Sequence, residues 1–290
     1  MFKALFFVLA VSTFLSIGSQ AAQGSFAPEN GMWIGADDKA AGGITEEQFN
    51  KTIDRLNVIY SPIVKAKKAK LVFERNWDDG TVNAYASQSG KTWTVAMFGG
   101  LARYDIMTPD GFGFVVCHEL SHHLGGAPKI VRLGSTSWAT NEGQADYIGA
   151  MKCMRELFKK DDNVSIVKTM KVDTIVTQKC NLVYKDPALA AICIRTSMAG
   201  KVLAEVLNRL AEGQTPVSFT TPDTHVVSST DDSHPEAQCR LDTYFAGALC
   251  DKDLGQKLSD KDVLVGTCNS SQGLKIGIRP LCWFKPGKAK

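Results

Sequence analysis

Hydrophobic and polar positions alternate along the chain with two different periods. Thr45-Glu46-Glu47-Gln48 has the form of a capping box, and the apolar residues after it recur at helical spacing as far as Ser61-Pro62. Three runs with a period of two follow, at residues 70–76, 81–88 and 91–98, and turn signals separate them. The pattern predicts one helix and then a small antiparallel sheet.

The remainder of the chain has mostly helical periodicity. Thr108 and Pro109 fit the N-cap and the first position of a helix that Gly125-Gly126 ends. Further helices are predicted from about Ser137 or Thr140 to Lys159, from Asp186-Pro187 to Gly213, and after a capping box at Ser233–Glu236. The expected fold class is therefore α+β, mostly helical with a small antiparallel sheet.

The first residues have the pattern of a secretory signal peptide. Lys3 precedes an almost unbroken apolar run from Ala4 to Ile17, and small residues up to Ala22 follow. We expect cleavage after Ala21 or Ala22, since the run is too short for a stable membrane anchor. The expected mature protein is soluble, has no integral membrane segment and is periplasmic or secreted.

Composition indicates which partners the protein binds and whether its cysteines are oxidised. The chain has 33 Lys and Arg against 30 Asp and Glu, a net charge of +3 that indicates no nucleic-acid partner. Its 8 cysteines predict up to four disulfides in an exported chain. We expect Cys180–Cys193 and Cys268–Cys282 as local pairs, and the absence of a CxxC spacing argues against a cysteine zinc site.

The candidate chemistry lies in His118-Glu119-Leu120-Ser121-His122, an HExxH sequence inside a predicted helix. Residues four apart share a helical face, so both imidazoles can point at one zinc ion. Glu119 is offset by one residue and is expected to act as a general base on a metal-bound water. The alternative is a surface helix with two solvated histidines.

A third ligand is expected from the next predicted helix. Glu142 lies in the segment 141–146, where a crossing helix could deliver its carboxylate to the ion. Asp146, one turn later, is placed to accept the other ring N–H of a ligand histidine. One zinc ion per chain, held by His118, His122 and Glu142, is therefore the expected cofactor.

These motifs together resemble the gluzincin family of CAAX prenyl proteases and HtpX-like peptidases. The HExxH sequence at 118–122 is followed by an ExxAD element that begins at Glu142. Residues 82–86 and 93–101 are similar to the family's NAF strand, its next strand and its Gly-Leu turn, and His234-Pro235 with Arg240 resembles its HPxxxxR element. The resemblance extends over about residues 45–250.

The resemblance implies a zincin architecture with a cleft between the sheet edge and the metal helix. An extended peptide substrate would add to the edge strand, where Asn83 and Ala84 would offer hydrogen bonds. It also implies that His234 or Arg240 lies near the metal and stabilises the oxyanion of the tetrahedral intermediate.

The chain departs from the family pattern at two places. Ser135–Trp138 stands where the family often has an arginine, and the transmembrane helices of the prenyl proteases are absent. The second departure favours peptide or protein substrates over prenylated ones. Cys117, beside His118, is expected to form a disulfide and not to bind the metal.

The sequence thus predicts a zinc-dependent endopeptidase acting on exported or extracellular proteins. One alternative is a metal-stabilised binding or chaperone-like module with little hydrolytic activity, although the intact Glu119 argues against it. Another is a zinc hydrolase that acts on other substrates. The predicted organisation is a signal peptide at 1–22, a loose leader at 23–43, a metallopeptidase domain at 44–254 and a cysteine-containing tail at 255–290.

Overall fold

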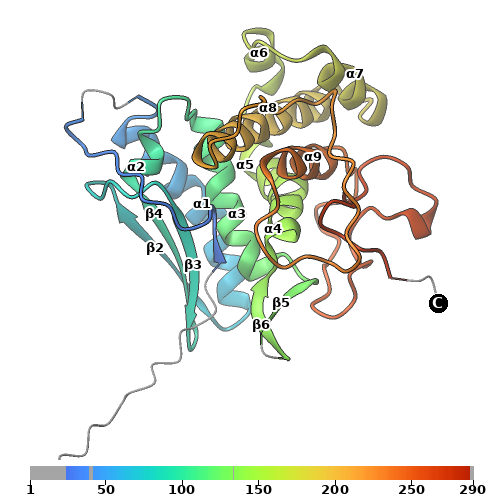
Figure 1. Cartoon of the computed structure of the whole chain (residues 1–290), viewed down its shortest axis with the longest axis horizontal. Helices are drawn as coiled ribbons and strands as arrows, with labels where there is room; N and C mark the ends of the chain where they lie inside the picture. The colour runs from blue at the N-terminus through green and yellow to red at the C-terminus, as the bar shows by residue number, and fades with distance from the viewer. Residues whose placement is uncertain (1–23, 39–41, 133, 288–290) are drawn as a thin grey trace, which may run out of the picture.

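The computed structural model describes residues 24–38, 42–132 and 134–287. The expected signal peptide, residues 1–22, lies outside this part of the chain. Figure 1 shows a small sheet on one side of the molecule, helices α8 and α9 on the other, and α3 between them. None of the helices in the described ranges is long and apolar enough to cross a membrane.

The main sheet is mixed, so the prediction of an antiparallel sheet was wrong. Its strands are β1 (Gly24–Ser25), β2 (Lys70–Asn76), β3 (Ala84–Ser89) and β4 (Thr92–Phe98). Their order is β1-β3-β4-β2, with β2 parallel to β4 and the other neighbours antiparallel. A tight turn at Gly90, whose φ is +57°, pairs β3 with β4, and β2 takes the other side of β4.

The helices are α1 (Glu46–Ala66), α2 (Gly99–Ala102), α3 (Pro109–Leu124), α4 (Glu142–Ile148), the π-helix η1 (Gly149–Cys153), α5 (Met154–Phe158), α6 (Asn163–Lys168), α7 (Thr174–Val183), α8 (Pro187–Leu210), α9 (Ala237–Ala248) and the 3-10 helix η2 (Ser270–Gln272). The Thr45 capping box is confirmed, and so are the N-caps at Thr108 and Asp186. These caps are local hydrogen bonds, which is why the sequence predicts them well.

Two expected helix starts differ from the structure. Ser135–Thr140 form strand β6, which pairs with β5 (Lys129–Arg132), and the helix after it begins at Glu142 with Asn141 as its N-cap. The predicted capping box at Ser233–Glu236 is absent, because the Ser233 hydroxyl donates to Asp231 instead. In the first segment a β-hairpin forms in place of the first helical turn, and in the second a hydrogen bond two residues back takes the place of the cap.

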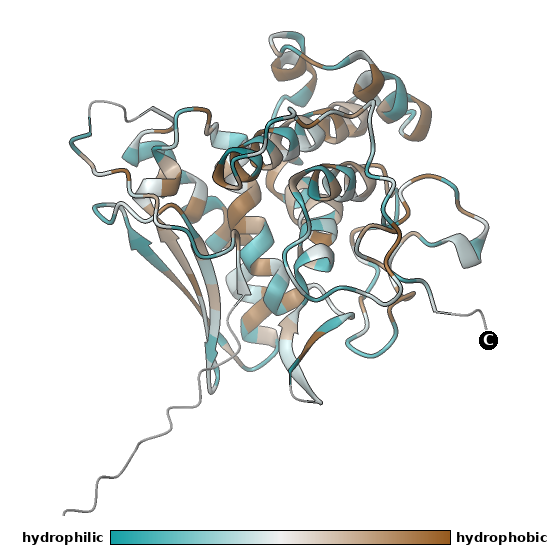
Figure 2. Cartoon of the chain, in the orientation of Figure 1, coloured by the Kyte–Doolittle hydropathy of each residue, from teal (hydrophilic) through white to brown (hydrophobic). Residues whose placement is uncertain are grey.

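The main hydrophobic core surrounds α3. Phe49 of α1, Val95 of β4 and Leu203 of α8 are all fully buried in the cluster that also contains Phe112 and Val116 of α3. Figure 2 shows hydrophobic residues along α3 and α8, whereas the outer part of β2 is hydrophilic. Because α3 is enclosed by the sheet and by other helices, polar side chains in its second half are withdrawn from solvent.

Four disulfides connect the helical half. The expected pair Cys180–Cys193 is confirmed and joins α7 to α8. The expected pair Cys268–Cys282 is wrong, since Cys239–Cys282 and Cys250–Cys268 form instead. These two bonds tie the C-terminal segment to α9 and to Cys250, which follows α9. Trp283 of the C-terminal segment is fully buried. Four disulfides indicate an oxidising, extracytoplasmic location.

Part of the expected loose leader is held in place. Gly24 and Ser25 form β1, and both Phe26 and Ala27 are fully buried. A second contact follows at Trp33, which forms an isolated bridge with Thr81. The segment around β1 therefore belongs to the folded body of the protein.

Candidate metal centre

Helix α3 brings three polar side chains into the interior. His118, Glu119 and His122 lie in its second half and each has 0% of its surface exposed. One ligand atom from each of the three lies within 4.8 Å of the others. His118 and His122, four residues apart, share one face of the helix, and Glu119 lies beside that face because it is offset by one residue.

The neighbouring element is α4, which supplies a carboxylate. Glu142 is the first residue of α4, behind the Asn141 N-cap whose side chain accepts from the Gln144 N–H. Glu142 Oε2 lies 3.2 Å from His118 Nε2, and Glu142 Oε1 lies 3.5 Å from His122 Nε2. The structure thus brings together all three residues that the sequence suggested as ligands.

Hydrogen bonds on the far side of each ring fix the proton positions. His122 Nδ1 lies 2.8 Å from the Thr140 carbonyl oxygen, which can only accept, so Nδ1 carries the proton. His118 Nδ1 lies 2.7 Å from the Asp146 carboxylate and is protonated for the same reason. In the neutral rings both Nε2 lone pairs therefore point at one another, 3.1 Å apart.

This arrangement fits a metal ion. Ligand atoms at about 2.0–2.1 Å from a tetrahedral zinc ion are about 3.3 Å from each other. The three separations among His118 Nε2, His122 Nε2 and Glu142 span 3.1–3.5 Å. Two facing lone pairs and a carboxylate in a buried site repel one another unless a cation lies among them. The buried group could therefore bind a metal.

The pKa values of the two histidines are shifted in opposite directions. Burial lowers the pKa of His118, but the Asp146 carboxylate outweighs it and raises the value to about 10. Burial lowers the pKa of His122 to about 4. Without a metal, the cluster therefore holds one proton on His118, which a metal ion would have to displace.

Glu119 is the buried carboxylate that has no partner. Neither of its oxygens has a hydrogen-bond partner, and it is fully buried. Burial raises its pKa to about 8, although the neighbouring His118 opposes the shift. Such an orphaned group is rare in folded proteins and indicates a water, an ion or a reactant at this position.

A buried ion pair between Asp146 and Arg240 lies on the Nδ1 side of the His118 ring. Arg240 of α9 donates to both oxygens of Asp146, at 2.8 Å from Nε and 2.7 Å from Nη2. Burial raises the pKa of Asp146, but Arg240 and His118 outweigh it and hold the pKa below its usual value. Arg240 thus contacts Asp146, and its Nη2 lies 3.5 Å from His118 Nδ1 on the side away from Nε2.

The two metal-site helices are also joined covalently. The disulfide Cys117–Cys153 connects α3, one residue before His118, to the π-helix that continues α4. This confirms the expectation that Cys117 forms a disulfide. Where the helices pass, a Cβ on Gly149 would lie 3.1 Å from the Phe114 ring. The π-turn and the partner of Cys117 were not predictable from the motif, because each depends on the helix crossing.

The remaining predicted residues lie next to the centre but contact the protein's own chain. His234 Nε2 lies 3.6 Å from Glu142 Oε2 and donates to the Ser25 carbonyl oxygen at 2.9 Å. The Asn83 side chain and the Ala84 carbonyl oxygen bond residues 26–27. The involvement of the leader in these contacts is what sequence reasoning missed.

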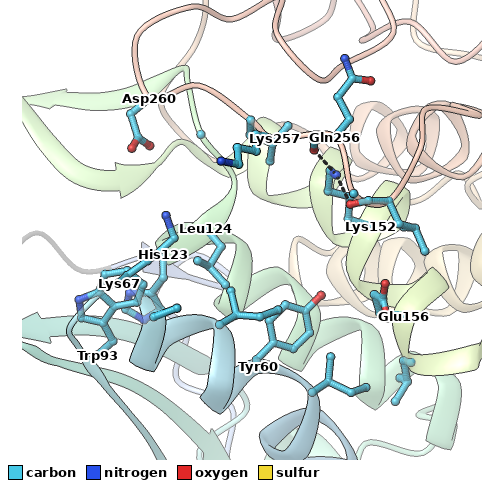
Figure 3. A pocket seen from close by; sticks show the side chains of 18 of the residues that line it. Tyr60, Lys67, Trp93, His123, Leu124, Lys152, Glu156, Gln256, Lys257 and Asp260 are labelled. Atoms are coloured by element: carbon cyan, nitrogen blue, oxygen red, sulfur yellow. Dashed lines mark hydrogen bonds between the residues drawn. The ribbon is translucent and has the colours of Figure 1, made fainter.

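His123 is separate from the metal centre. It is stacked between Trp93 and Trp138, with ring centroids 5.3 and 4.9 Å away, and its Nε2 donates to the Thr94 carbonyl oxygen. It borders a groove of about 2390 Å³, shown in Figure 3, that none of His118, Glu119, His122 or Glu142 lines. This groove is therefore separate from the candidate metal site.

Comparison with protein-family models, with curated proteins and with solved structures finds no match for this chain. The resemblance to the gluzincin peptidases therefore rests on the sequence motifs alone.

The Cys117–Cys153 disulfide is expected to set the metal affinity through the helix crossing. Replacing both cysteines with alanine should lower the free energy of unfolding by about 2–4 kcal/mol and weaken zinc binding by about tenfold. The matched control is alanine at Cys180 and Cys193, which should cost similar stability and leave zinc affinity unchanged. Unfolding curves and zinc titrations check this, and equal zinc affinities in the two variants would contradict it.

Metal binding is expected to release a proton. Because the pKa of His118 is about 10 in the metal-free protein, its imidazolium is the populated form at pH 7–9, and zinc affinity should fall about tenfold for each pH unit lowered. Calorimetry in buffers of different ionisation enthalpy counts the protons. Asp146→Asn removes the carboxylate that raises this pKa and should reduce the release, whereas a pH-independent affinity would disprove the assignment.

Proposed function

We propose that the protein is a zinc-dependent endopeptidase whose ion is held by His118, His122 and Glu142. The observation that carries the proposal is the meeting of His118 Nε2 and His122 Nε2, 3.1 Å apart, with the Glu142 carboxylate, beside a buried Glu119 without partners. A donor set of two imidazoles and one carboxylate suits zinc and leaves a fourth position open.

The chain's own residues would divide the chemistry between them. A zinc ion bound here would supply a Lewis acid that polarises a carbonyl and makes water more acidic. Glu119, whose buried carboxylate oxygens have no hydrogen-bond partner, would take a proton from the attacking water and pass it to the leaving amine. His234 Nε2, which donates to a backbone carbonyl in the structure, would donate to the oxygen on which negative charge develops.

The sheet provides the means of holding a peptide. β3 lies at the edge of the three-stranded part β3-β4-β2 and packs against α3, and the β1 backbone at Gly24 lies along that edge next to His122. An extended peptide added there would obtain backbone hydrogen bonds from β3 irrespective of its sequence. This favours peptide or protein substrates over small molecules and agrees with the resemblance to the gluzincins.

The alternative of a metal-stabilised binding module is favoured by one observation, the near-complete burial of all four polar residues. A purely structural site would be closed in this way. Glu119 argues against it, because a structural site has no use for an unpaired buried carboxylate beside the ligands.

Glu119→Gln separates the two functions. It should leave zinc binding at about one ion per chain and lower kcat/KM for peptide hydrolysis by about 10²–10⁴-fold, because glutamine cannot accept the proton. The matched control is Glu74→Gln, at an exposed position on β2, which should change neither. Zinc analysis and cleavage of casein or a peptide library give the answer. If the zinc-loaded wild type and the zinc-loaded Glu119→Gln variant cleave every peptide at the same rate, the proposed peptidase activity is refuted.

A further inference from the structure

The chain itself occupies the edge of β3. The residues Gly24–Ala27, called here the N-terminal segment, begin with β1, in which Gly24 lies opposite Ala86 and Ser25 opposite Tyr85. The Phe26 N–H donates to the Ala84 carbonyl oxygen at 3.1 Å. In Figure 1 this short blue strand lies between β3 and the helices. The segment thus takes the place of an added antiparallel strand.

The side chain of Asn83 clamps the end of the segment. Its Oδ1 accepts from the Ala27 N–H at 3.1 Å, and its Nδ2 donates to the Ala27 carbonyl oxygen at 3.0 Å. These are the two backbone groups that a bound peptide would offer at that position. The predicted substrate-binding residues Asn83 and Ala84 therefore bind the protein's own backbone.

On its other side the segment lies against the metal centre. A Cβ on Gly24 would lie 2.5 Å from His122 Cδ2 and 2.7 Å from His122 Nε2, so only a glycine backbone fits against the ring. The next carbonyl, that of Ser25, accepts from His234 at 2.9 Å. The carbonyl of Phe26 accepts from Arg240 Nη1. Three consecutive residues are thus contacted by residues of the site.

Phe26 anchors the segment. It is fully buried, with its ring edge-on to His118 at a centroid distance of 6.1 Å and the Arg240 guanidinium 5.2 Å from its centroid. The residues directly beyond the segment, 28–31, are exposed. The attachment is therefore short, with one aromatic side chain and a few backbone hydrogen bonds.

With the segment in place, the donor atoms are closed off. His118 and His122 have 0% of their surface exposed and Glu142 has 3%. A substrate carbonyl cannot reach them along β3 while Gly24 and Ser25 fill that edge, since one strand edge pairs with one partner at a time.

We propose that the N-terminal segment is an internal occupant of the substrate position, and that the centre is latent until the segment leaves the edge of β3. The inference rests on the proposed function, because it takes β3 as the substrate-binding edge. It also names the substrate class: extended peptides that run antiparallel to β3, with glycine against His122 and an aromatic residue two positions toward the C-terminus.

Substitution of Gly24 tests the occupancy without removing Phe26. Gly24→Ala and Gly24→Val place side-chain atoms where the His122 ring lies and should displace the strand. The matched controls are Gly31→Ala and Gly31→Val, because a Cβ there meets nothing within 4 Å. If Gly24→Val does not fold, Gly24→Ala, which adds a single methyl group, carries the test.

Three readouts are compared among these variants. They are the rate at which a chelator extracts zinc, the affinity for a fluorescent Gly-Ser-Phe-Ala peptide, and the rate of peptide cleavage. The extraction rate and the peptide affinity should each rise at least about tenfold in both Gly24 variants, since losing one or two backbone hydrogen bonds shifts an equilibrium by about that factor. The Gly31 variants should match the wild type.

The outcomes separate this inference from the proposed function. If the folded Gly24 variants and the Gly31 variants give equal extraction rates and equal peptide affinities, the segment does not close the site and the inference is overturned. If extraction and peptide binding rise but no peptide is cleaved, the occupancy stands and the endopeptidase proposal fails. If cleavage rises as well, both stand.

Discussion

Two imidazole Nε2 atoms that lie 3.1 Å apart in a dry interior, beside a carboxylate, need a proton or a metal ion between them. Much of the structure around the centre serves that one constraint. The Thr140 carbonyl fixes the tautomer of His122, and Asp146 fixes that of His118. The bond Cys117–Cys153 and the close pass at Gly149 hold α3 against the chain that carries Glu142.

The centre also determines how the helical half is assembled. A fully buried Asp146 would be costly alone, and Arg240 compensates it through two short hydrogen bonds. This ion pair connects α9 to α4 and to the Phe26 carbonyl, which Arg240 also contacts. Removing either charge would leave the other buried and unpaired, so the pair fixes the relative position of the three elements more than it adds stability.

The sequence predicted what is encoded locally. The caps at Thr45 and Thr108 depend on residues three apart, and the convergence of His118 with His122 follows from helical geometry alone. The prediction that Glu142 lies close to His118 and His122 could not be made from Glu142 alone and needed the HExxH sequence before it. The place of β4 in the middle of the sheet and the pairing Cys239–Cys282 could not be predicted, because both join segments far apart in the chain.

The contacts of residues 24–27 also could not be predicted from the sequence, because they too join segments far apart in the chain. Glycine, alanine and serine in residues 23–43 have the composition of a loose segment, and nothing local marks Gly24 as special. Its lack of a side chain is explained only by His122, whose ring lies where a Cβ would be. Without β1 the edge of β3 would be unpaired, and an unpaired edge can pair with any extended backbone. The feature that would let β3 bind a peptide is therefore the one that lets it bind its own chain, and two residues of β1 are enough to cover it beside the candidate metal ligands.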